Sequence, residues 1–141
     1  MVEHNFEQLI KIFNLSVKYY SKKKISHATR VAEYAAIRAE ENHLDSIRAY
    51  KIGLAHDLLE DTECPEEELI AAIGEINYNS VVLLTKSNDQ DYEDYIRKII
   101  ESKDNYAFVV KQADMKDHMT FTKSLSEKLL NKYAPVLHYF L

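Results

Sequence analysis

Glycine and proline are almost absent from this sequence, which limits the folds it can adopt. Only two of each occur in 141 residues, whereas an all-β sandwich or barrel needs many tight turns. Apolar residues instead recur at the i, i+3, i+4, i+7 spacing of amphipathic helices along nearly the whole chain. We therefore expect residues 1–141 to form one compact all-α domain, a bundle of about seven or eight helices.

Apolar stripes and capping residues set the expected helix boundaries. The stripe Phe6, Leu9, Ile10, Phe13 and Val17 predicts a first helix over residues 3–20. Ser26 is the expected N-cap of a second helix, whose stripe is Val31, Ala32, Ala35 and Ala39. Asp45 is the expected N-cap of a third helix that carries Ile47, Leu54 and Leu58 and continues to about residue 60.

The second half of the chain continues the helical pattern. A short helix is expected between Pro65 and Gly74. Further helices are expected at residues 75–85, 91–102, 104–119 and 122–139. Pro135 should end or kink the last one. The run VVLL at 81–84 could alternatively be a buried strand, but no segment nearby offers it a partner.

Composition excludes several classes of protein. The net charge of −5 argues against a nucleic-acid binder, which usually carries a basic face. No apolar run approaches the roughly 20 residues that span a bilayer, and the N-terminus does not resemble a secretory signal. The single cysteine, Cys64, excludes an internal disulfide and a cysteine-only zinc site. We expect a cytoplasmic protein that binds neither membranes nor nucleic acids; the sequence leaves its oligomeric state open.

The segment AHDLLEDT at residues 55–62 places four ionisable side chains in apolar surroundings, where unpaired charges are costly. On a regular helix, His56 lies one turn from Glu60, and Asp57 one turn from Asp61. An imidazole and a carboxylate supply two ligands for a divalent cation, which would offset the cost of their burial. Further ligands must then come from other helices.

Two residues elsewhere lie in a similar context. His27 begins the Ala-rich stretch ISHATRVAEYAA, and Asp114 lies in YAFVVKQADMKDHM, where it shares a polar stripe with Lys111 and His118. His27 could alternatively be a helix cap or a hydrogen-bonded core residue, and Asp114 an ion-pair partner. The triplet Lys22-Lys23-Lys24 is either a solvated loop or a small phosphate-binding patch.

The order of these motifs resembles that of the HD-domain metal-dependent phosphohydrolases, in which an isolated His precedes a His-Asp pair and a distant Asp. HDLLEDT is similar to the HDxxED motif of the RelA/SpoT-type hydrolase domains, which remove pyrophosphate from the alarmone ppGpp. VVKQADMKDHM resembles their VKxADxxxN segment, and SHATRVAEYAA their xHPxxVAxxLA segment. LTKSNDQDYEDYIRKI is similar to the small stand-alone members, so the likeness covers roughly residues 17–120.

The resemblance implies an HD-domain bundle with a divalent metal, typically manganese. Its four ligands would be His27, His56, Asp57 and Asp114. Glu60 and Asp61 match the acidic pair that positions or activates the attacking water, and helix geometry places a base close to the metal in the same way. The implied substrate contacts are Lys22, Lys23, Lys24, Lys111 and His118.

The sequence departs from the group's pattern at three places. Ala28 replaces the usual proline after the first histidine, and Asp117-His118 replaces His-Asn, so His118 stands at the position that faces the nucleoside. The basic loop is shorter and lacks its glycine. These changes leave the metal ligands intact and concern the substrate.

We therefore expect a metal-dependent phosphohydrolase that acts on a small phosphorylated nucleotide, with (p)ppGpp, cleaved at its 3′-diphosphate, as the leading substrate. One alternative is an HD-type nucleotidase or another nucleotide pyrophosphohydrolase. Another is a non-catalytic domain that binds a nucleotide or a partner and keeps a structural metal. The acidic pair Glu60-Asp61 favours catalysis, because a purely structural site has no use for it.

Overall fold

The computed structural model describes residues 2–121 and 126–141, and every regular element in these ranges is helical. The elements are α1 (Val2–Tyr19), α2 (Lys22–Glu41), α3 (Ser46–Ala55), α4 (Leu58–Asp61), α5 (Glu66–Ile73), α6 (Glu75–Leu83), α7 (Tyr92–Ser102), α8 (Asn105–Thr120), α9 (Glu127–Tyr133) and the 3-10 turn η1 (Leu137–Phe140). The predicted all-α class is confirmed, and residues 81–84 are helical or in a turn rather than a strand. The expected helix at 122–139 begins outside the described residues and is interrupted at Pro135, as predicted.

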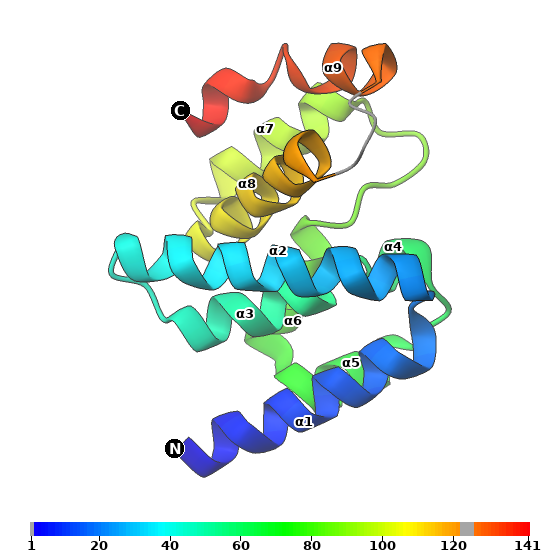
Figure 1. The fold of residues 1–141 in the computed structure, drawn as a ribbon, viewed down its shortest axis with the longest axis vertical. Coiled ribbons are helices and arrows are strands. Elements are labelled where there is room, and N and C mark those ends of the chain that lie inside the picture. The colour runs from blue at the N-terminus through cyan, green and yellow to red at the C-terminus, as the bar shows by residue number, and fades with distance from the viewer. Residues whose placement is uncertain (1, 122–125) are drawn as a thin grey trace.

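Helix α2 is the centre of the fold, packed along α3 on one side and α8 on the other (Figure 1). Its predicted stripe of Val31, Ala32, Ala35 and Ala39 is fully buried. A Cβ atom on Gly53 of α3 would lie only 2.9 Å from the Ala32 Cα, so the two helices touch backbone to backbone. This close approach holds the end of α3 firmly against α2.

The start of α2 differs from the prediction. Ser21, not Ser26, is the N-cap, and its hydroxyl accepts a hydrogen bond from the backbone N–H of Lys24. Ser26 instead accepts a hydrogen bond from the Arg30 guanidinium. The lysine triplet is therefore the first turn of a helix rather than a loop. Asp45 caps α3 as predicted, by accepting from the backbone N–H groups of Ile47 and Arg48.

The expected continuous helix from residue 45 to residue 60 is broken between α3 and α4. The hydroxyl of Tyr20 accepts from the backbone N–H of Asp57 at 3.2 Å and donates to the carbonyl of Leu54 at 2.8 Å. The His56 ring donates a hydrogen bond to the carbonyl of Gly53. In a regular helix that carbonyl would accept from the backbone N–H of Asp57. Side chains thus replace the backbone ladder, and His56 and Asp57 lie at the break.

Helix α1 packs against α5 and α3. Ile12 and Ser16 are buried on this side, whereas most of the apolar stripe that predicted the helix faces solvent. Phe6 and Val17 are 63% and 72% exposed, and Ile10 and Phe13 more than 40%. In the parts of the chain that the structure describes, no helix has the length and apolar content needed to cross a membrane.

Candidate metal centre and adjoining pocket

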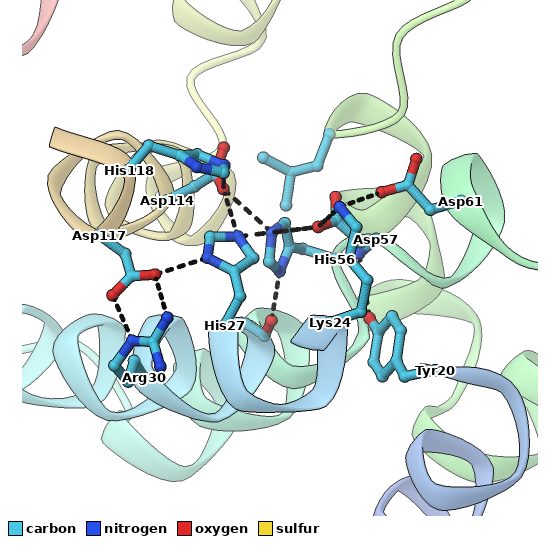
Figure 2. Close-up of polar contacts among 12 residues, drawn as sticks. Tyr20, Lys24, His27, Arg30, His56, Asp57, Asp61, Asp114, Asp117 and His118 are labelled. Atoms are coloured by element: carbon cyan, nitrogen blue, oxygen red, sulfur yellow. Dashed lines mark hydrogen bonds and ion pairs between the residues drawn. The ribbon is translucent and has the colours of Figure 1, made fainter. Parts of the chain in front are cut away.

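Four side chains from three parts of the chain meet beside α2. His27 comes from the second turn of α2, His56 and Asp57 from the break between α3 and α4, and Asp114 from α8 (Figure 2). One potential ligand atom from each lies within 4.8 Å of the others. These are the four residues that the family resemblance implies as metal ligands, and the structure brings all of them together.

The distances between these atoms suit a single divalent cation. Asp114 Oδ1 lies 2.9 Å from His27 Nε2 and 3.3 Å from His56 Nε2. Asp57 Oδ2 lies 3.2 Å from His56 Nε2 and 3.8 Å from His27 Nε2. Ligands bound at about 2.0–2.2 Å from one ion are separated by roughly 3.0–3.5 Å in tetrahedral or octahedral geometry. The cluster could therefore hold a metal ion with small adjustments.

Each histidine is oriented by a second hydrogen bond on its other ring nitrogen. His56 Nδ1 donates to the carbonyl of Gly53 at 2.6 Å. His27 Nδ1 donates to Asp117 Oδ2 at 2.7 Å. Both rings therefore direct Nε2 at the two carboxylates, where loss of its proton would present a lone pair to a cation.

Asp117 is fully buried and is held from its other side by Arg30, whose Nε and Nη2 donate to its two oxygens at 2.7 and 3.0 Å. These bonds, together with the His27 ring, keep the pKa of Asp117 below its usual value although burial alone would raise it. No role was predicted for Asp117 from the sequence. Its position one turn after Asp114, together with Arg30 one turn after His27, was the available signal.

Charge compensation keeps the buried carboxylates ionised. Burial raises the pKa of Asp114, but the Lys111 ammonium at 2.9 Å and three histidines outweigh it and hold that pKa well below the ordinary range. Conversely, burial lowers the pKa of Lys111, and Asp114 raises it well above its ordinary value. Burial also opposes ionisation of Asp57, yet His56 beside it makes its net pKa shift downward.

A pocket of about 200 Å³ opens directly onto this cluster. Its other charged residues are Lys24, Glu60, Asp61, Lys86, Lys111 and Lys132, and its aromatic walls are Tyr92, Tyr95 and Tyr133. Its four ammonium groups are matched by four carboxylates, so a divalent cation in the cluster would make the pocket positive overall and favour an anionic ligand. A larger cavity of about 420 Å³ between α2 and α8 contains no histidine or aspartate and is unsuited to metal chemistry.

Only three of the five predicted substrate contacts lie at this pocket. Lys24, Lys111 and His118 line it, whereas Lys22 and Lys23 are exposed and do not. A helical first turn explains the difference, because consecutive residues point about 100° apart. His118 Nε2 lies 3.3 Å from Asp114 Oδ1, and the His118 ring lies 4.4 Å from the His27 ring.

The acidic pair occupies the wall beside α4. Glu60 accepts a hydrogen bond from the backbone N–H of Lys86 at 2.7 Å, and burial raises its pKa. Asp61 Oδ2 lies 2.7 Å from the Lys24 ammonium, which also approaches Asp57 at 3.4 Å (Figure 2). The two carboxylates therefore differ: Asp61 is ion-paired, and Glu60 is held by an uncharged donor.

Lys86, Lys132, Tyr92 and Tyr133 were missed by sequence reasoning. They come from the loop after α6, from α7 and from α9, and only the tertiary fold brings them to the pocket. The Lys132 ammonium lies 4.7 Å from the centre of the Tyr92 ring. Burial and the nearby Lys111 lower the pKa of Lys132.

Comparison with known proteins does not extend these observations. A scan against protein-family models and a search of curated proteins each gave no match for this chain. The class of site is therefore defined by its own geometry: a buried two-histidine, two-aspartate cluster that could hold a metal ion, next to a pocket lined by lysines.

Proposed function

We propose that this protein is an HD-type metal-dependent phosphohydrolase that acts on a small phosphorylated nucleotide. The proposal rests on one observation: the metal cluster and the lysine-lined pocket share residues. His56, Asp57 and Asp114 belong to both. Structural metal sites are closed by protein ligands, whereas catalytic sites keep a position open to the substrate. A metal in this cluster, proposed to be manganese, would face the pocket.

The pocket supports a substrate with several phosphates. Lys24, Lys86, Lys111 and Lys132 can balance negative charge, and the tyrosines offer flat surfaces to a base or ribose. Together with the likeness of HDLLEDT and VVKQADMKDHM to RelA/SpoT-type hydrolases, this makes (p)ppGpp the leading substrate, with hydrolysis at its 3′-diphosphate. Another nucleotide phosphate with the same charge is the alternative.

Each group at the site has a separate role in the proposed reaction. A divalent cation would supply Lewis acidity toward a phosphoryl oxygen and activate water for attack. Glu60 is assigned as general base, because its carboxylate lines the pocket, has a raised pKa and, among the described residues, is not ion-paired to a lysine. Asp61 positions Lys24 through their ion pair, and Lys24 then faces the phosphates. Lys111 stabilises the charge on Asp114.

The direct test is to incubate the manganese-loaded protein with ppGpp, nicotinamide dinucleotide phosphates and nucleoside monophosphates, and to identify the products by anion-exchange chromatography. We expect pyrophosphate and GDP from ppGpp. His56→Ala, which removes a ligand, is the matched inactive control. Release of a single phosphate from another nucleotide would favour a nucleotidase, and metal binding without any turnover would contradict the proposal in favour of a binding domain.

A further inference from the structure

One face of α1 carries a row of exposed apolar side chains that the fold leaves unused. Phe6, Ile10, Phe13 and Val17 follow one another at intervals of four, three and four residues, so they form a single stripe. Their exposed fractions are 63%, 46%, 41% and 72%. Four of the eleven exposed large hydrophobic side chains in the described residues thus lie on one helix face. A contiguous patch of this kind marks an interaction surface.

An apolar hollow of about 240 Å³ lies next to the stripe. It is lined by Leu9, Phe13, Ala36, Ser46, Ile47 and Tyr50, so Phe13 belongs to both features. The Phe13 ring packs edge-on against Tyr50, with ring centres 6.0 Å apart. Protruding side chains beside a hollow can interlock with a second copy of the same surface, as a two-fold interface requires.

One pair of opposite charges beside the stripe favours an antiparallel arrangement of the two copies. Glu7 and Lys18 are both exposed and, at 3.6 residues per turn, lie within about 20° of each other on the same flank of the stripe. If two α1 helices run antiparallel with Phe6 level with Val17 of the second copy, Glu7 is about 3 Å along the axis from the level of Lys18 of that copy. A parallel two-fold pair would instead place this flank of the two copies on opposite sides of the interface, so Glu7 could not approach Lys18 across it.

We propose that α1 forms a two-fold homodimer interface in which the helices of two copies pack antiparallel through this stripe. Helix α1 lies at one edge of the molecule, with α5 beside it (Figure 1). None of the stripe residues belongs to the metal cluster or its pocket. The proposal therefore goes beyond the proposed function and does not depend on it.

Sedimentation velocity over the micromolar range tests the interface. We expect a concentration-dependent dimer for the wild type. Ile10→Glu should weaken association at least about tenfold, since a two-fold interface contains the substitution twice. The matched control is Ile76→Glu, at a position on α6 that is 71% exposed and outside the stripe; it should leave the dimer intact. Circular dichroism checks that both variants remain folded.

A charge exchange tests the antiparallel arrangement. Glu7→Lys and Lys18→Glu should each weaken the dimer, and the double variant should restore it. Lys18 also lies 3.6 Å from Glu68 in its own chain, but that contact cannot produce a restoration that depends on residue 7. A wild type that is monomeric throughout, or a dimer indifferent to Ile10→Glu, would overturn the interface. Failure of the double variant to recover would overturn the antiparallel arrangement.

Discussion

His27 donates its Nδ1 hydrogen to Asp117 across 2.7 Å, and this single contact decides which ring nitrogen faces the metal cluster (Figure 2). The Asp117 carboxylate has a lowered pKa and so can only accept the bond. Nδ1 must therefore carry a proton, which leaves Nε2, 2.9 Å from Asp114 Oδ1, as the nitrogen that would bind a cation. Asp117 acts through His27 and is a positioning residue, not a ligand.

Asp117→Asn should lower manganese affinity about 10- to 100-fold, which is the usual effect of losing a carboxylate behind a histidine ligand. Asp117→Ala should lower it further, because it also leaves Arg30 without its buried partner. Isothermal titration with manganese measures both effects without an activity assay. Asp94→Asn, on the exposed face of α7, is the control. Unchanged affinity in both Asp117 variants would show that His27 is oriented by other contacts.

The second prediction concerns the ligands themselves. His56→Ala should empty the site, and Asp57→Ala should do the same. Wild type should gain about 2.7 kcal/mol of unfolding free energy at a manganese concentration 100-fold above its dissociation constant. The variants should gain almost none. Elemental analysis and thermal unfolding with and without chelator give the answer, and equal metal content in wild type and His56→Ala would exclude His56 as a ligand.

The sequence predicted the composition of the site better than its surroundings. His56 and Asp57 stood out as ionisable residues in an apolar segment, and His27 and Asp114 were candidates in a similar context. Only the resemblance to the HD-domain phosphohydrolases joined the four into one ligand set. Local pattern could not predict the helix break at His56, because Tyr20, far away in the chain, supplies the competing hydrogen bonds. Periodicity likewise predicted α1 but not which face the domain covers, since that depends on the position of α5 and α3.

Cys64 provides a pH prediction independent of the metal. Burial, followed by the negative charge of Glu68, raises its pKa to about 11. Because the folded-state pKa lies above the unfolded value, the stabilisation is fully present below the unfolded pKa and is lost as pH rises through the folded one. The free energy of unfolding should therefore fall more steeply between pH 9 and 11 in wild type than in Cys64→Ala. Parallel pH curves for the two proteins would contradict the assigned burial effect.

The three lysines of the first turn of α2 should differ in their effect on substrate binding. Lys24→Gln should raise the KM for substrate, because Lys24 lines the pocket, whereas Lys22→Gln combined with Lys23→Gln should change it little. Lys86→Gln and Lys132→Gln should resemble Lys24→Gln. The effects should shrink as salt rises, since charges are screened over roughly 8–10 Å at physiological ionic strength. An effect confined to Lys22 and Lys23 would place the phosphates outside the pocket.

Glu60→Gln should separate catalysis from metal binding. The four-ligand cluster is complete without Glu60, whose carboxylate accepts the backbone N–H of Lys86, a bond that glutamine can keep. Glutamine cannot take a proton from the attacking water, so turnover should fall about 10²- to 10⁴-fold while metal content stays constant. Glu63→Gln, an exposed neighbour outside the pocket, is the matched control and should keep full activity. Full turnover in Glu60→Gln would mean that another group is the base, and loss of metal would make Glu60 a fifth ligand.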